Sequence, residues 1–195
     1  MTIQPEIEIF LLAGGKSSRM GEDKGLASLA GKSILHYTLE TLRLLDIPIT
    51  IIAHDSRYEK FVEKVIPDTI RDKGPMGGLH TVFLNSSADY VLLQSCDMPF
   101  VPVEAYYMLM DQAGGHEVIV AEIDGRINPL LALYHKFLRT KVESNIKNDK
   151  LKMLDLIANS HSKVVNLDKL KTQNILAFAN INTKEELEKI AKLLK

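Results

Sequence analysis

The sequence predicts an α/β fold in which helices cover a mainly parallel β-sheet. Short apolar segments rich in β-branched residues alternate along the chain with segments whose apolar residues recur at helical spacing. The length of 195 residues and the hydrophobic content of 46% suit one domain over residues 1–195 with a sizeable core. A glycine-rich loop directly after the first apolar segment indicates a ligand site at the carboxyl edge of the sheet.

The expected strands are short and apolar, as buried strands are. They cover residues 7–12, 49–53, 90–94, 117–121, 130–134 and 163–167. A turn at Gly125 leads into the fifth of these strands, and Pro129 is expected at the start of that strand, where proline is tolerated.

Helical spacing and start signals predict the helices between and after these strands. Leucines recur at positions 35, 39, 42 and 45. Pro102 favours a helix that begins near Val103. Thr183 and Glu186 have the spacing of a capping box, so the last helix is expected to begin there. Residues 139–152 are polar and rich in lysine, which indicates a solvated helix and loop rather than a binding patch.

Charge and cysteine content exclude several classes of function. The chain has 24 basic and 25 acidic residues and a net charge of −1, so nothing points to a nucleic-acid partner or an anionic membrane. Cys96 is the single cysteine, which rules out an internal disulfide and a thiolate metal cage. The first residues lack the basic region of a secretory signal, and no apolar run approaches a membrane span. We therefore expect a cytoplasmic protein.

Residues 11–24 carry the strongest chemical signal in the chain. They read Leu-Leu-Ala-Gly-Gly-Lys-Ser-Ser-Arg-Met-Gly-Glu-Asp-Lys and follow the first strand directly. Gly14 and Gly15 let the backbone turn and bring its N–H groups close to a ligand, while Arg19 and Lys24 add charges suited to a polyphosphate. We interpret the segment as a phosphate-binding loop. The alternative is a glycine-rich turn with solvated charges.

The loop is neither of the two best-known phosphate-binding motifs. Gly31-Lys32-Ser33 has the ending of a Walker A motif, but Leu26 stands where its first glycine belongs. The Gly-x-Gly-x-x-Gly fingerprint is also absent after the first strand. This argues against a P-loop GTPase and against an NAD enzyme.

Two further segments carry candidate ligand-binding residues at the same predicted carboxyl edge of the sheet. Asp97 follows the strand at residues 90–94, where it is a candidate Mg²⁺ ligand or, alternatively, the cap of the next turn. Residues 72–80 form a second glycine-rich turn that opens a helix. Its free N–H groups suit a base or a phosphate, although a tight loop without a ligand is the simpler reading.

The first loop resembles the Leu-Ala-Gly-Gly-x-Ser-x-Arg-Met-Gly-x-Asp-Lys signature of the sugar-nucleotide-type nucleotidyltransferases, and among them it is most similar to the molybdenum cofactor guanylyltransferases. Four later segments resemble motifs of the same family, in the same order. They are Gly-Pro-Met-Gly-Gly from residue 74, Cys-Asp-Met-Pro from residue 96, Gly-Arg-Ile-Asn-Pro-Leu from residue 125 and Asn-Ile-Asn-Thr from residue 180. The resemblance implies a three-layer α/β/α sandwich with a Rossmann-like, mostly parallel sheet of the nucleotide-diphospho-sugar transferase type.

The resemblance also implies roles for individual residues, with the nucleotide on the N-terminal half and the acceptor on the C-terminal half. The implied catalytic residues are Arg19, Lys24 and Asp97. The implied nucleotide-binding residues are Leu12, Ala13, Gly14, Gly15, Lys24, Asp68, Gly74, Pro75, Gly78 and Asp97. The implied acceptor-binding residues are Arg126, Asn128, Pro129, Asn180 and Asn182, and the implied Mg²⁺ ligands are Asp97 and Asn182.

The expected activity is transfer of GMP from GTP to molybdenum-bound molybdopterin, with transient contacts to other molybdenum cofactor biosynthesis proteins or to apo-molybdoenzymes. One departure concerns the base. The family commonly has an Asn after the second strand, whereas this chain has Ala53, so that contact is missing or is made by Asp55 or the backbone. Two alternatives stay open: a cytidylyltransferase or another nucleotidyltransferase of the superfamily, and a non-catalytic protein that binds a nucleotide or cofactor.

Overall fold

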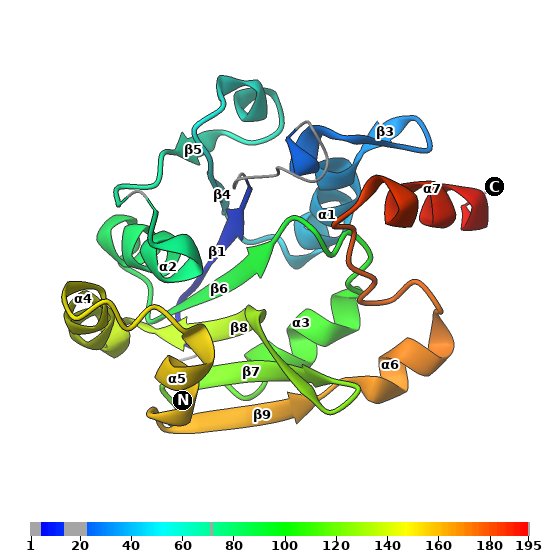
Figure 1. Cartoon of the computed structure of the whole chain (residues 1–195). Coiled ribbons are helices and arrows are strands. Elements are labelled where there is room, and N and C mark those ends of the chain that lie inside the picture. Colours follow the sequence, from blue (N-terminus) through cyan, green and yellow to red (C-terminus); the bar gives the residue numbers. More distant parts are fainter. Residues whose placement is uncertain (1–4, 14–22, 71, 195) are drawn as a thin grey trace.

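The computed structural model describes residues 5–13, 23–70 and 72–194 (Figure 1). The strands are β1 Ile7–Leu12, β2 Ser28–Leu29, β3 Lys32–Ser33, β4 Ile49–Ile52, β5 Lys64–Ile66, β6 Tyr90–Ser95, β7 Val118–Ile123, β8 Arg126–His135 and β9 Ser162–Asn166. The α-helices are α1 Ile34–Leu42, α2 Gly74–Asn85, α3 Val103–Met110, α4 Arg139–Lys147, α5 Met153–Ala158, α6 Asp168–Gln173 and α7 Lys184–Leu193. Short 3₁₀ turns are η1 Lys24–Leu26, η2 Arg43–Leu45, η3 Ser56–Lys60 and η4 Lys136–Leu138.

Seven strands form one sheet in the order β5-β4-β1-β6-β8-β7-β9. Strands β5, β4, β1 and β6 pair in parallel, and so do β7 and β9. Strand β8 runs antiparallel to its neighbours β6 and β7. The mostly parallel sheet expected from the sequence is therefore confirmed.

Alternating side chains of the central strands send two cores to opposite faces of the sheet. Ile9 and Leu11 of β1 join a core that includes residues of α1 and α3, while Phe10 joins a core that includes residues of α2, α4 and α5. This alternation is the consequence of the two-residue repeat of a strand. Figure 1 shows α2, α4 and α5 on one side of the sheet and α1 and α3 on the other. The three-layer arrangement is confirmed.

Each predicted strand is present in the structure. Most of the observed strand ends lie within two residues of the predicted ends. The main error concerns β8, which begins at Arg126 rather than at Leu130, so Pro129 lies inside the strand and not at its start. The register of β7 with β8 jumps from Ala132 to Asn128, and this irregularity accommodates a proline that has no N–H to donate. Four further elements were not predicted from the sequence: the short strand β5, the β2–β3 hairpin, and helices α5 and α6.

The β2–β3 hairpin anchors a third and smaller apolar cluster outside the sheet. Its buried members come from the segment after η1, from β2, from α1, from the segment that leads into α7 and from α7 itself, and they are Ala27, Leu29, Ile34, Ile181 and Ile190. Their burial removes apolar surface from water and thereby holds the C-terminal helix against the N-terminal third of the chain. The last helix lies beside the hairpin in Figure 1.

A buried polar network fixes the loop that follows β6. Gln94 is fully buried, its Oε1 accepts a hydrogen bond of 2.5 Å from the hydroxyl of Tyr106, and its Nε2 donates to the carbonyl of Met98 at 3.2 Å. Burial raises the pKa of Tyr106 well above its ordinary value, so the hydroxyl stays protonated and donates.

In the part of the chain that the structure describes, no helix combines the length and apolar character that crossing a membrane requires.

Replacement Gln94→Leu should lower the free energy of unfolding by about 1–3 kcal/mol, because it leaves the Tyr106 hydroxyl and the Met98 carbonyl buried without a partner. Adding Tyr106→Phe should recover part of that loss, since it removes the buried hydroxyl that has lost its hydrogen-bond partner. Urea denaturation of both single variants and the double variant measures this. Costs that simply add would contradict the network.

Candidate functional site

The carboxyl ends of the central parallel strands meet at one edge of the sheet. Leu12 at the end of β1 is paired with Ile52 of β4 and with Ser95 of β6. The next residues continue this alignment, because the Ala13 N–H donates to the Ile52 carbonyl and the Cys96 N–H donates to the Leu12 carbonyl, both at 3.0 Å. The chain therefore leaves the three strands at a common level, which is where ligands bind in open α/β sheets.

Three predicted site residues from distant parts of the chain come together at this edge. The ammonium group of Lys24 donates to Oδ1 of Asn182 at 2.7 Å and lies 3.5 Å from Oδ2 of Asp97. The side chains of Lys24 and Asp97 are only 20% and 22% exposed, so water screens their attraction less than at an open surface. The site thus joins the loop after β1, the loop after β6 and the segment before α7.

Lys24 is held in place by the residues on either side of it. Asp23 caps η1 by accepting a hydrogen bond from the Gly25 N–H at 3.0 Å, and it also accepts one from the hydroxyl of Tyr58. Tyr58 is fully buried, and this burial raises its pKa, which keeps the donating proton on the ring oxygen. No signal in the sequence marked Tyr58, since its partner is 35 residues away.

Asp97 is oriented by the end of β6 and by the segment before α7. The hydroxyl of Ser95 donates to its Oδ1, and the backbone carbonyl of Asp97 accepts a hydrogen bond of 2.9 Å from the N–H of Ile181. The second contact ties the loop after β6 directly to the segment that carries Asn182. Ser95 was not predicted, although a serine two residues before a candidate ligand was a usable signal.

The N-terminus of α7 fixes the backbone of Asn182. The predicted capping box is confirmed: the Thr183 hydroxyl accepts from the Glu186 N–H, and Oε2 of Glu186 accepts from the Thr183 N–H at 3.1 Å. The same Oε2 accepts from the Asn182 N–H at 2.7 Å. Because Ile181 is buried in the third apolar cluster, packing and capping both act on this short segment.

The predicted nucleotide-binding residues of the second loop lie at the same edge. Asp68 follows β5, and Gly74 and Pro75 form the first turn of α2, where Gly74 adopts a φ of +56°. Gly78 faces the end of β1 so closely that a Cβ there would lie 2.8 Å from a methyl carbon of Leu12. A Cβ at residue 78 would force the Leu12 side chain to shift, so glycine suits this close approach of helix to strand.

The carboxylate of Asp55 has its partners within its own turn. It caps η3 by accepting from the Arg57 N–H at 2.9 Å, and it pairs with the Arg57 guanidinium at 2.6 Å. The guanidinium and the backbone N–H hold the pKa of Asp55 below its ordinary value. Ala53 itself is buried, and its N–H donates to the Ile66 carbonyl at 2.9 Å.

The predicted acceptor residues are only partly brought to the site. Asn128 lies beside the loop after β6, because its Nδ2 is 3.1 Å from the sulfur of Met98, and the Pro129 carbonyl accepts from the Tyr134 hydroxyl at 2.7 Å. Arg126 is exposed at the start of β8. Asn180 is also exposed and lines a largely apolar groove of about 270 Å³ against α7. Among the described residues, no hydrogen bond joins Asn180 to Asn128.

Three of the predicted residues, Gly14, Gly15 and Arg19, lie outside the described residues. The structure therefore describes the predicted phosphate-binding loop only at its two ends, at Ala13 and from Asp23 onward.

The oxygens at the site have the chemistry of a magnesium site. Asp97 offers a carboxylate and Asn182 an amide oxygen, and the ammonium of Lys24 lies against both. Among the described residues, no group of three or more His, Cys, Asp or Glu side chains gathers at one point. Mg²⁺ typically takes one or two protein carboxylates and completes its shell with substrate phosphates and water, so this donor set fits it.

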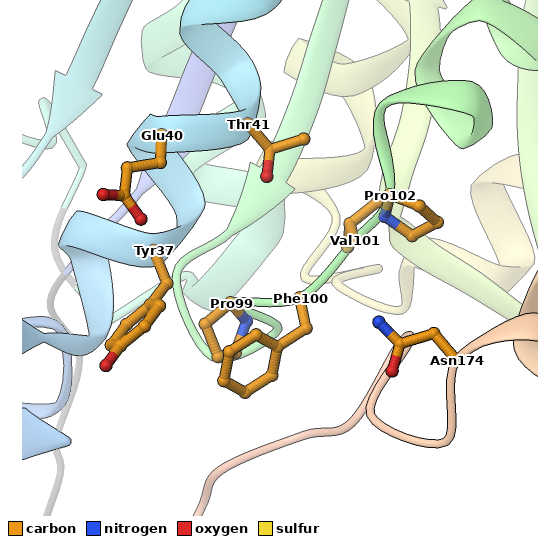
Figure 2. A pocket seen from close by; sticks show the side chains of 8 residues that line it. All are labelled: Tyr37, Glu40, Thr41, Pro99, Phe100, Val101, Pro102 and Asn174. Atoms are coloured by element: carbon orange, nitrogen blue, oxygen red, sulfur yellow. The ribbon is translucent and has the colours of Figure 1, made fainter. Parts of the chain in front are cut away.

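A separate cavity of about 250 Å³ lies next to the site loop (Figure 2). It is lined by Tyr37, Glu40 and Thr41 of α1, by residues 99–102 and by Asn174. The rings of Tyr37 and Phe100 pack against each other at its wall, with centroids 5.4 Å apart. None of the predicted site residues lines this cavity, so it is separate from the candidate site.

Comparison with known proteins gives a consistent result. Residues 9–164 match the MobA-like NTP transferase domain. A protein of Flavobacterium johnsoniae named "Probable molybdenum cofactor guanylyltransferase" is 31% identical over 91% of this chain and 93% of its own length. A Geobacillus protein of the same name is 33% identical over 92% and 95%.

Among solved structures, the molybdopterin-guanine dinucleotide biosynthesis protein A of Archaeoglobus fulgidus superposes with a TM-score of 0.79. It is 22% identical, and the alignment covers 96% of this chain and 98% of that one. This likeness supports the fold.

Replacement Gly25→Ala should disturb the hydrogen bond between Tyr58 and Asp23 that positions Lys24, because a Cβ at residue 25 would lie 2.5 Å from the Tyr58 hydroxyl. We expect a loss of about 1–3 kcal/mol in the free energy of unfolding, as for other overpacked sites. In a Tyr58→Phe background the clash is relieved, so the same replacement should cost less. Denaturant unfolding of the four proteins measures the coupling, and an equal cost in both backgrounds would contradict it.

Proposed function

The chain belongs to the MobA-like NTP transferase family, and we propose that it transfers GMP from GTP to molybdenum-bound molybdopterin, forming the guanine dinucleotide cofactor and pyrophosphate. The observation that carries the proposal is the meeting of Lys24, Asp97 and Asn182 at the carboxyl edge of the sheet. The names of the relatives from Flavobacterium johnsoniae and Geobacillus support the choice of substrates.

The proposed reaction is a substitution at phosphorus. An oxygen of the acceptor's terminal phosphate forms a bond to the α-phosphorus of GTP, and the bond from that phosphorus to the bridging oxygen breaks. Pyrophosphate leaves with the electron pair of the broken bond. A phosphate with a second pKa of about 6 is already anionic near neutral pH, so the attack needs little help from a general base.

The residues of the site would then act by alignment and by charge. Lys24 would bind the triphosphate, and the turn at Leu12 and Ala13, together with Gly14, Gly15 and Arg19, would bring further donors to it. We propose Asp97 and Asn182 as ligands of Mg²⁺, which when bound supplies positive charge against the phosphate oxygens. Asp68 and the first turn of α2 would contact the rest of the nucleotide.

We assign the acceptor to the C-terminal half. Asn128 and Pro129 on β8 lie beside the loop that carries Asp97, and Asn182 joins the same cluster. We propose Arg126 and Asn180 for the outer part of the acceptor, since both are exposed beyond this cluster. The reaction is expected in the cytoplasm, with transient contacts to the proteins that supply or receive the cofactor.

The experiment that tests this function compares GTP, CTP and ATP with Mg²⁺ and molybdenum-bound molybdopterin. We expect pyrophosphate release only with GTP and acceptor together, and the largest rise in melting temperature with GTP, because a ligand of the folded state stabilises it by mass action. Preference for CTP would favour the cytidylyltransferase alternative. Binding of nucleotide without any release would favour the non-catalytic alternative.

Replacement Asp97→Ala should lower turnover at least about a hundredfold, the size of effect seen when one electrostatic contact to a transition state is removed. The side chain is partly exposed, so the melting temperature should change little. The matched control is Asp89→Ala, which removes a surface carboxylate paired with Lys136 at 2.8 Å, just before β6 begins. Turnover by the Asp97 variant close to that of the control would remove Asp97 from the mechanism.

A further inference from the structure

Thr81 of α2 is a polar residue buried completely among apolar ones. Its exposed fraction is 0%, and its neighbours Leu79, Val82 and Phe83 belong to the core of that face of the sheet. A buried hydroxyl is costly unless its hydrogen bonds are made. The partners of Thr81 therefore indicate why a threonine stands there.

The hydroxyl of Thr81 connects α2 to the loop after β5. It lies 2.7 Å from Oδ1 of Asp68, 2.9 Å from the N–H of Thr69 and 2.9 Å from the hydroxyl of Thr69. A hydroxyl has one proton to donate and two lone pairs. The short, charge-assisted bond to Asp68 uses the proton, and the two groups of Thr69 fill the lone pairs.

The common alternative for a helical threonine is a bond to the carbonyl four residues earlier. The Thr81 hydroxyl does lie 3.1 Å from the Gly77 carbonyl, but this is longer than its distance to the carboxylate. The hydroxyl therefore favours Asp68, and its shorter contacts are all with residues 68 and 69.

Asp68 is consequently held by one oxygen only. Its Oδ1 accepts from Thr81 and from the Ile70 N–H at 3.2 Å, while its Oδ2 has no partner in the hydrogen bonds of the described residues. Oδ2 lies 3.5 Å from the position that a Cβ of residue 77 would take, which is an ordinary van der Waals distance, and Gly77 places no side chain against it. Among the described residues, one oxygen is therefore held by hydrogen bonds and the other can accept from a ligand.

We infer that Thr81 is a positioning residue that orients the carboxylate of Asp68 toward the nucleotide. The inference rests on the proposed function, because the contact between Asp68 and the nucleotide is part of it. Thr81 itself touches no substrate and acts through Asp68, and a hydrogen bond to a charged group is strong enough to change an equilibrium about tenfold.

The test measures GTP affinity by calorimetry in the full-length protein. Thr81→Val keeps the shape and removes the hydroxyl, and it should weaken GTP binding about tenfold. Thr81→Ser keeps the hydroxyl and should bind within about twofold of the wild type. In an Asp68→Ala background, Thr81→Val should cause no further loss, because its effect passes through the carboxylate.

Thr38→Val is the matched control. Thr38 is a second helical threonine, 1% exposed, whose hydroxyl has no hydrogen-bond partner in the described structure. Its replacement should leave GTP affinity unchanged. Circular dichroism at the titration temperature establishes that each variant is folded.

Amide hydrogen exchange provides a readout that does not need the nucleotide. Thr81→Val should speed exchange at Thr69, whose N–H loses its acceptor, while Thr81→Ser should not. Wild-type GTP affinity in the folded Thr81→Val protein, a loss as large in Thr81→Ser, or unchanged exchange at Thr69 would each overturn the inference. A wild-type protein that binds no GTP would overturn the proposed function, and the exchange at Thr69 still decides whether the hydroxyl holds the loop.

Discussion

The candidate site depends on the parallel register of β1 with both of its neighbours. The pairing of Leu12 with Ile52 and Ser95 makes three strands end at the same level, and the loops that follow them start from one line. A slip of one residue in this register would move each side chain of β1 to the other face of the sheet. The hydrophobic cores on the two faces of the sheet both disfavour such a slip, because Ile9 and Leu11 pack on one face and Phe10 packs on the other.

Register alone does not complete the site, because Asn182 comes from outside the sheet. The third apolar cluster supplies the missing constraint, since Ile181 packs with Leu29 of the β2–β3 hairpin while the neighbouring Asn182 meets Lys24. The polar contacts act on a segment that burial has already brought near. In functional sites it is typical that apolar packing sets the position of a side chain and hydrogen bonds set its orientation.

The sequence predicted the α/β class, the main strands, the capping box of α7 and the edge where the loops gather, because these follow from local pattern and spacing. It also predicted Lys24, Asp97 and Asn182, which the structure brings together. It did not predict Tyr58 or Thr81, whose roles depend on partners 35 and 13 residues away that no local pattern specifies. The predicted start of β8 was wrong because Pro129, which is typical of the first residue of a strand, is accommodated inside it by an irregularity in the pairing.

The contact between Lys24 and Asn182 spans 158 residues and has a consequence for the order in which the molecule is made. During synthesis the N-terminal residues emerge from the ribosome first, and domains tend to form as their sequence becomes available. Strands β1, β4, β5 and β6 can pair while the last helix is still being translated. The nascent chain would then hold this edge of the sheet without Asn182, and the cluster of three becomes complete only after the segment before α7 has been made. The edge that carries the site therefore forms before the site itself is whole.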